Sequence, residues 1–342
     1  MMENLHQSIL YEELTGSRVR CQVCQWRCVI VLGKVGVCKM YQNNEGKLYT
    51  LNYAVVSSTA VDPIEKKPLF HFFPGSQVFS LGTWGCNFHC RDCQNWEIAI
   101  AKPARESQII SPQAAVDLAR RYNCGGIAWT YNEPSVWFEY TLDSARLARE
   151  NNLYTVYVTN GYLTPEALDT IGPFLDAWRV DIKGFSDAFY RKLAKIHRWQ
   201  GILEVAKRAK DKWDMHVEVV TNIIPTMNDD DEQLKGIANW IYSELGELTP
   251  WHVTRFYPHH NLSHLSPTPI HTLERALAIG RGAGLKFIYT GNVPGHQSEN
   301  TICYSCGKLL VKRHGYSTEL VGLDGSRCRF CGADLNIVVP EQ

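Results

Sequence analysis

The sequence predicts an α/β protein built as a partial (β/α)6 barrel, with a cysteine-rich extension at each end. Short apolar runs rich in β-branched and aromatic residues alternate with helix-patterned segments, which is typical of parallel βαβ units. Polar residues directly follow several of these runs, as expected where catalysis gathers at the C-terminal ends of barrel strands. A chain of 342 residues is long enough for one such domain with small additions.

Six runs are predicted to be strands, and two proline-containing starts mark helices between them. Ser111 before Pro112 and Thr164 before Pro165 have the pattern of an N-cap followed by proline at the first helical position. A similar helix start lies within 266–272, and residues 285–289 are expected to add a short last strand. An open doubly wound sheet would show the same periodicity. The predicted strands are 78–83, 126–131, 154–159, 177–182, 215–220 and 253–257.

The cysteines divide the chain into three predicted parts. Residues 1–75 form an N-terminal cysteine-rich extension with a strand-like segment at 47–58, residues 76–299 form the barrel, and residues 300–342 form a C-terminal module. The twelve cysteines cluster accordingly, and only Cys124 stands apart, as a small buried residue.

Composition excludes some partners. Lys plus Arg and Asp plus Glu both number 35, so no basic surface for nucleic acid or an anionic membrane is expected. The first residues lack a secretory signal pattern, and no apolar run approaches the ~20 residues that span a bilayer. We therefore expect a cytoplasmic protein, in which clustered cysteines favour metal ligation over disulfides.

The central motif is a C-x3-C-x2-C run directly after the first predicted barrel strand, formed by Cys86, Cys90 and Cys93. Three thiolates on one loop can hold three irons of a [4Fe-4S] cluster and leave the fourth iron open. The alternative is a zinc site with a distant fourth ligand, although zinc knuckles favour C-x2-C pairs.

This motif resembles that of the radical S-adenosylmethionine (SAM) superfamily. More closely, the stretch from Arg20 to Cys331 resembles the radical SAM enzyme of the AmmeMemoRadiSam system, which is itself similar to pyruvate formate-lyase activating enzymes. The matching pieces are Arg20-Cys21-Gln22-Val23-Cys24, Lys47-Leu48-Tyr49, Cys93-Gln94-Asn95-Trp96, Thr130-Tyr131-Asn132-Glu133-Pro134, Thr159-Asn160-Gly161, Asp181-Ile182-Lys183, Arg255-Phe256-Tyr257-Pro258 and Tyr289-Thr290-Gly291-Asn292.

The resemblance implies cofactors, partners and a reaction. SAM would chelate the open iron, and the reduced cluster would cleave it to methionine and a 5′-deoxyadenosyl radical that abstracts hydrogen. AMMECR-like and Memo-like proteins are implied partners, with flavodoxin or ferredoxin as electron donor. One position departs from the superfamily: Asp92 stands where an aromatic residue commonly packs near the adenine, so Phe88 is the candidate for that contact.

The resemblance also assigns SAM-binding residues after the strands. Asn132 and Glu133 would hold the SAM ammonium, although Glu133 could instead cap the helix starting near Pro134. Asp181 and Lys183 point to one face of their strand and would grip the methionine carboxylate, or else form a surface ion pair.

Three further residues that follow or end strands are candidates for SAM contacts. Asn160 could hydrogen-bond SAM or merely belong to an Asn-Gly turn. His259, which is followed by His260, resembles an activating-enzyme histidine near the adenosine. Asn222 would reach the ribose, or be a buried structural residue.

Two further groups have four cysteines each. Cys303-x2-Cys306 and Cys328-x2-Cys331 match a four-cysteine zinc ribbon. Zinc is favoured for the N-terminal group, and an auxiliary iron–sulfur cluster is the alternative. That N-terminal group consists of Cys21, Cys24, Cys28 and Cys38.

Two other functions are also compatible with the sequence. One is a glycyl-radical-enzyme activase of the pyruvate formate-lyase activating type. The other is a non-catalytic zinc-ribbon interaction protein or cluster carrier.

Overall fold

A computed structural model describes residues 6–100 and 107–340. The described chain divides into two compact units, which interleave along the sequence. The first unit contains the residues up to Asp62, Val78–Trp178 and Leu193–Met215, and the second contains Pro63–Gln77, Arg179–Lys192 and the chain from His216 onward.

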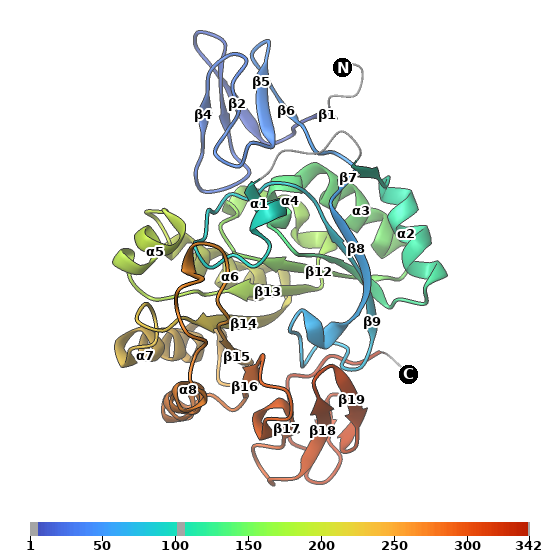
Figure 1. The fold of residues 1–342 in the computed structure, drawn as a ribbon. Coiled ribbons are helices and arrows are strands. Elements are labelled where there is room, and N and C mark those ends of the chain that lie inside the picture. The colour runs from blue at the N-terminus through green and yellow to red at the C-terminus, as the bar shows by residue number, and fades with distance from the viewer. Residues whose placement is uncertain (1–5, 101–106, 341–342) are drawn as a thin grey trace. The chain divides into compact units, whose positions relative to one another are not determined.

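Eight strands form one sheet in the order β16-β15-β14-β13-β12-β11-β9-β8 (Figure 1). From β9 onward this order follows the chain without the reversal that defines a doubly wound sheet. The neighbours β9, β11 and β12 are parallel, as are β14, β15 and β16. The predicted α/β fold of the partial-barrel type is confirmed. The strands are β8 (Ser58–Pro63), β9 (Gln77–Gly82), β11 (Gly126–Trp129), β12 (Tyr154–Thr159), β13 (Ala177–Asp181), β14 (His216–Ile223), β15 (Trp251–Arg255) and β16 (Ile288–Gly291).

The predicted helix starts also hold. Ser111 Oγ accepts a hydrogen bond from Ala114 N at 3.2 Å, and Thr164 Oγ1 accepts one from Ala167 N at 3.1 Å. Each bond satisfies one of the backbone donors that a helix start leaves unpaired. The third helix begins at Ile270, within the predicted range of 266–272, and Pro269 is its N-cap. The helices are α1 (Trp96–Ile100), α2 (Pro112–Arg121), α3 (Phe138–Glu150), α4 (Pro165–Ile171), α5 (Asp187–Ala194), α6 (Gln200–Trp213), α7 (Asp231–Trp240) and α8 (Ile270–Gly282).

The N-terminal extension consists of short strands in small antiparallel sheets, β2-β3-β4 and β1-β6-β5. The single strand predicted at 47–58 is interrupted, because Ala54 adopts a left-handed φ of 60° that no regular strand accommodates. The strands are β1 (His6–Gln7), β2 (Tyr11–Leu14), β3 (Arg18–Cys21), β4 (Val29–Ile30), β5 (Tyr41–Asn44), β6 (Lys47–Thr50) and β7 (Val55–Val56), the last paired with β10 (Gln108–Ile109).

The C-terminal module is a three-stranded antiparallel sheet followed by a hairpin. Its strands are β17 (Thr301–Ile302), β18 (Leu309–His314), β19 (Ser317–Leu320), β20 (Leu323–Asp324) and β21 (Arg327–Cys328). The apolar core of the module also includes Phe70, Phe287 and Tyr289 from elsewhere in the second unit. The three-part division remains a prediction. Within the described ranges, no helix combines the length and apolar character needed to cross a bilayer.

Candidate functional site

The three cysteines of the central motif lie on the loop between β9 and α1, and each is half-buried. Phe88 N lies 3.4 Å from Cys86 Sγ and donates to it, and Cys93 N donates to Cys90 O at 3.4 Å. The Cys86 thiol therefore accepts a hydrogen bond from within its own loop, and a backbone turn joins Cys90 to Cys93.

The start of this loop is held by Asn132, one of the predicted site residues. Its Nδ2 donates to Gly85 O at 2.6 Å, and its Oδ1 accepts from Thr83 N at 3.1 Å. Gly85 itself has a φ of 84°, and a Cβ there would lie 2.6 Å from Met40 Cγ and 2.9 Å from Cys38 O. Only glycine fits this close approach.

Asn160 lies next to the loop. Its Nδ2 donates to Asn87 Oδ1 at 2.7 Å and lies 4.0 Å from Cys86 Sγ. Its Oδ1 accepts from Tyr162 N at 3.0 Å, and Gly161 has a φ of 74°. Asn160 is therefore both a turn residue and a neighbour of the first predicted cluster ligand.

Glu133 is buried and fully engaged with the chain. Its carboxylate accepts from Ser135 N at 3.0 Å, from Thr159 Oγ1 at 2.8 Å and from Asn160 N at 2.8 Å. Burial raises the pKa of Glu133, and the two backbone donors oppose that shift. The capping role is present, at the 3-10 turn Pro134–Trp137. Contact with SAM stays a prediction, and the geometry supports a positioning role.

In the second unit, Asp181 and Lys183 form an ion pair, with Lys183 Nζ 2.8 Å from Asp181 Oδ2. Arg179, which the sequence analysis did not single out, donates to the other carboxylate oxygen. Although burial opposes ionisation, Arg179 and Lys183 lower the pKa of Asp181. Val180 and Ile182 point to the opposite, fully buried face, so the predicted alternation is confirmed.

The remaining predicted residues of the second unit lie at strand ends. Asn222 lies on β14, and its Oδ1 accepts from Thr254 Oγ1 at 3.3 Å. His259 follows β15, is exposed and precedes the 3-10 turn His260–Leu262. Their SAM contacts remain predictions.

Phe88 does not offer an open ring for adenine. It is 2% exposed and packs against Tyr162, with ring centroids 5.2 Å apart. An aromatic residue next to a cysteine motif can support the loop as readily as a ligand, and the sequence does not distinguish the two.

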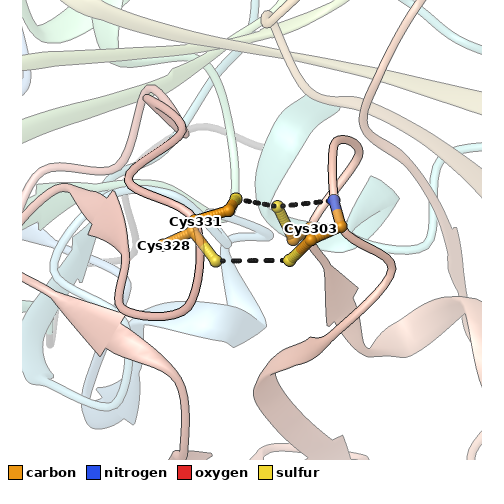
Figure 2. Close-up of side chains that lie close together, drawn as sticks. Cys303, Cys328 and Cys331 are labelled. Carbon is orange, nitrogen blue, oxygen red and sulfur yellow. Dashed lines mark hydrogen bonds between the residues drawn. The ribbon is translucent and has the colours of Figure 1, made fainter.

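Cys303, Cys306, Cys328 and Cys331 come together on two facing loops (Figure 2). Cys303 Sγ lies 3.6 Å from Cys331 Sγ, and Cys306 Sγ lies 3.7 Å from Cys328 Sγ. A tetrahedral ion with Zn–S bonds of about 2.3 Å separates its sulfurs by about 3.8 Å. Backbone hydrogen bonding from Ala333 lowers the pKa of Cys331 to about 7. The donor set therefore fits one zinc ion.

The four N-terminal cysteines line one cavity in the first unit, with the apolar side chains of Val23, Ile30, Val37 and Val136. Burial raises the pKa of Cys21 and Cys24, and it raises the pKa of Cys38 to about 11. The isolated Cys124 is buried as predicted, with 5% of its surface exposed.

A family model described as the radical SAM superfamily matches residues 82–241, which include the cysteine loop. A pyruvate formate-lyase-activating enzyme of Clostridium pasteurianum is 25% identical over 178 residues, 49% of this chain and 72% of that enzyme. A radical SAM methyltransferase from Sphaerobacter thermophilus has the same fold, with a TM-score of 0.51 at 16% identity over 70% of this chain and 71% of that one.

The chain therefore contains a radical SAM domain over residues 82–241, and this superfamily implies a [4Fe-4S] cluster and SAM. The similarity of this chain to other proteins extends beyond residues 82–241. The chain is 43% identical over 338 residues to the uncharacterized protein MJ0808 of Methanocaldococcus jannaschii, covering 98% of this chain and 100% of that protein. The predicted similarity to activating enzymes is confirmed.

Proposed function

We propose that this enzyme reductively cleaves SAM at a [4Fe-4S] cluster held by Cys86, Cys90 and Cys93, and uses the resulting 5′-deoxyadenosyl radical to abstract hydrogen in an AmmeMemoRadiSam-type system. One observation supports this most: three half-buried thiols share one loop, and Asn160 Nδ2 lies 4.0 Å from the first of them.

The donor set suits the cluster. Three thiolates leave one iron without a protein ligand, and this is where SAM would bind through its amino and carboxylate groups. When bound, the cluster supplies the electron that breaks the sulfonium bond. The chain contributes binding and orientation.

The residues around the loop have distinct tasks in this proposal. Asn132 holds the loop entry through Gly85 O, and Glu133 holds Asn160 N, so both position the site. Asp181 orients Lys183, whose ammonium is assigned to the methionine carboxylate of SAM. Asn222 and His259 are assigned to the ribose and the adenosine.

The decisive experiment is anaerobic incubation with SAM and reductant, with 5′-deoxyadenosine measured by mass spectrometry. Wild type should form it, and a variant with Cys86, Cys90 and Cys93 all replaced by Ala should not. Cys124→Ala is the matched control, because this buried thiol lies in none of the three cysteine groups, and it should behave as wild type. A triple variant that still cleaves SAM would overturn the proposal.

Lys183 can be tested by SAM affinity. Loss of one charge-assisted contact is worth roughly 1.5–3 kcal/mol, so Lys183→Gln should weaken binding about ten- to a hundredfold. Lys235→Gln is the control, because Lys235 forms an exposed pair with Asp231 in the same unit. Equal affinities in the two variants would contradict the assignment.

The system itself is tested by adding AMMECR-like and Memo-like proteins, with flavodoxin or ferredoxin as donor, and looking for new product masses. The second candidate, a glycyl-radical activase, is supported by the activating-enzyme relative. It predicts instead a protein-based glycyl radical on a large partner, which electron paramagnetic resonance would detect. The third candidate, a non-catalytic carrier, predicts no 5′-deoxyadenosine at all.

A further inference from the structure

The N-terminal cysteines follow the small strands of the extension. Cys21 ends β3, Cys24 follows it, Cys28 precedes β4, and Cys38 precedes β5. All four line one cavity, although they are spread over 18 positions of chain. Such convergence of thiols marks a metal site, and its spacing decides between a single ion and a cluster.

The C-terminal cysteine group shows the ligand spacing expected for a single metal ion, and the N-terminal group can be compared with it. The ligand atoms of the C-terminal group all lie within 4.8 Å of one another, as four thiolates around one ion require. Over residues 6–100 and 107–340, this is the one group of three or more His, Cys, Asp or Glu side chains with that property. No three of the four N-terminal sulfurs meet this 4.8 Å limit, so the group does not have the spacing of four thiolates around one zinc ion.

This departure from single-ion spacing is shared with the central loop. Cys86, Cys90 and Cys93 also fall outside the single-ion group, although their motif is that of a four-iron cluster. A cluster places several irons and bridging sulfides between its ligands, so its thiolates must stand apart. Besides the thiols, the N-terminal cavity is lined mainly by apolar side chains such as Val23, Ile30 and Val136. The hydroxyls of Tyr41 and Ser135, which also line it, are hydrogen-bonded to Glu139 and Asn87.

We propose that Cys21, Cys24, Cys28 and Cys38 hold a second iron–sulfur cluster, which relays electrons to the central loop. One electron from a reduced ferredoxin or flavodoxin reduces this cluster. The same electron then passes to the cluster at Cys86, Cys90 and Cys93, so the N-terminal cluster returns to its oxidised state and the second is reduced by one electron. The destination of the electron rests on the proposed function.

Direct contacts link the two cysteine groups within the first unit. Trp26, two residues after Cys24, donates its indole N–H to Asn87 O at 2.8 Å, and Asn87 follows Cys86. Cys38 O lies against Gly85, which precedes Cys86.

A further link runs through a side chain of the cavity itself. Asn87 Nδ2 donates to Ser135 Oγ at 3.3 Å, and Ser135 lines the N-terminal cavity. Hydrogen bonds and a van der Waals contact therefore connect the N-terminal cysteine group directly to the central cysteine loop.

The test uses the full chain, purified anaerobically from cells supplied with iron and zinc and without chemical reconstitution. The variant with Cys86, Cys90 and Cys93 replaced by Ala should still hold about four irons and four sulfides, or about two of each for a [2Fe–2S] cluster, and about one zinc per chain. Its electron paramagnetic resonance spectrum after reduction should show one cluster. Adding Cys21→Ala and Cys38→Ala should remove the iron and leave the zinc.

Zinc at the N-terminal site would overturn the inference: the triple variant would then hold about two zinc ions and no iron. A triple variant without metal at this site would overturn it equally. If the variant with five replaced cysteines fails to fold, the iron count and spectrum of the triple variant still decide. Absence of SAM cleavage by wild type would contradict the proposed function and leave this iron count intact.

Discussion

The N-terminal and C-terminal cysteine groups each have four thiols, two of them buried, but the other two are exposed only in the C-terminal group. Cys306 and Cys331 are exposed, and their sulfurs pair closely with those of Cys328 and Cys303. Cys21 and Cys24 are buried beside an apolar cavity. A C-x2-C pair therefore does not define the metal, because the spacing of sulfurs across loops is set by packing.

The two groups are also tied to different partners. The C-terminal module shares an apolar core with Phe70, Phe287 and Tyr289, and is anchored by the buried Arg313. The N-terminal group is tied to the central loop through Trp26 and Gly85. We therefore expect changes in the N-terminal group to alter redox chemistry, and changes in the C-terminal group to alter stability.

The largest expected effect is loss of the C-terminal metal. Replacing Cys303 and Cys328 by Ala should remove about one zinc per chain, because structural zinc contributes folding free energy of about 10–16 kcal/mol in isolated modules. Since Phe70 and Tyr289 belong to the same core, hydrogen exchange should rise in 63–77 as well as in 300–342. If hydrogen exchange rises only in 300–342, the module is stable independently of the rest of the unit. If iron is lost instead of zinc, the C-terminal group holds a cluster, and the proposed difference between the two cysteine groups is wrong.

A smaller loss is expected from the anchor. The side chains of Arg313 and Glu65 are both 0% exposed, and Arg313 Nε lies 3.9 Å from Glu65 Oε1. It donates to Phe70 O and to Thr301 Oγ1, each at 2.7 Å. Arg313→Gln leaves a buried carboxylate uncompensated, which should lower the free energy of unfolding by about 3–5 kcal/mol.

The control for the anchor is Arg281→Gln, at an exposed position of the same unit. Denaturant unfolding, followed together with zinc content, should show destabilisation with the metal retained. Equal stability of the two variants would show that the shared core alone holds the module.

Acid should weaken the second unit through His71. Its Nε2 lies 2.6 Å from Tyr289 Oη, and burial lowers the pKa of His71 from 6.5 to about 3. Between these values the unfolded chain binds a proton that the folded chain does not. Stability is therefore undiminished above about pH 6.5 and falls below it, by about 1.4 kcal/mol per pH unit for this group.

The matched pair for this test is His71→Gln and His264→Gln, the latter at an exposed position. The first should flatten the acid slope measured by denaturant unfolding, and the second should not. Parallel slopes in both variants would assign the acid sensitivity to other groups, such as Glu218, whose pKa is also lowered.

The smallest effect is expected at the link between the N-terminal group and the central loop. Trp26→Phe keeps the ring but removes the indole N–H that reaches Asn87 O, which is worth about 0.5–1.5 kcal/mol. Iron and zinc contents should match wild type, while the SAM cleavage rate under limiting reductant should fall. An unchanged rate would mean that this bond is no part of the electron route.

Several features could be predicted from local sequence. Ser111 and Thr164 cap helices because a hydroxyl before proline satisfies a free backbone donor without help from distant residues. The strand 154–159 was predicted at its observed bounds because every residue in it is β-branched or aromatic. The alternation of Asp181, Ile182 and Lys183 follows from strand geometry.

Other features depended on tertiary contacts. Glu133 proved to be a buried acceptor for Thr159 and Asn160, which lie on another strand end. Arg179 completed the ion pair of Asp181, and Phe88 became buried against Tyr162. In each case the partner is distant in sequence or its orientation is set by packing, so no local pattern indicates it.

By itself, the sequence determined the class of enzyme, because the spacing of Cys86, Cys90 and Cys93 places three thiols on one short loop. It also determined the order of strands and helices, since their periodicity is local. Only the tertiary structure decided how far apart the sulfurs of each four-cysteine group stand, because those distances are set between loops that meet only after packing. This is the physical reason that two similar cysteine patterns are proposed to hold different metals.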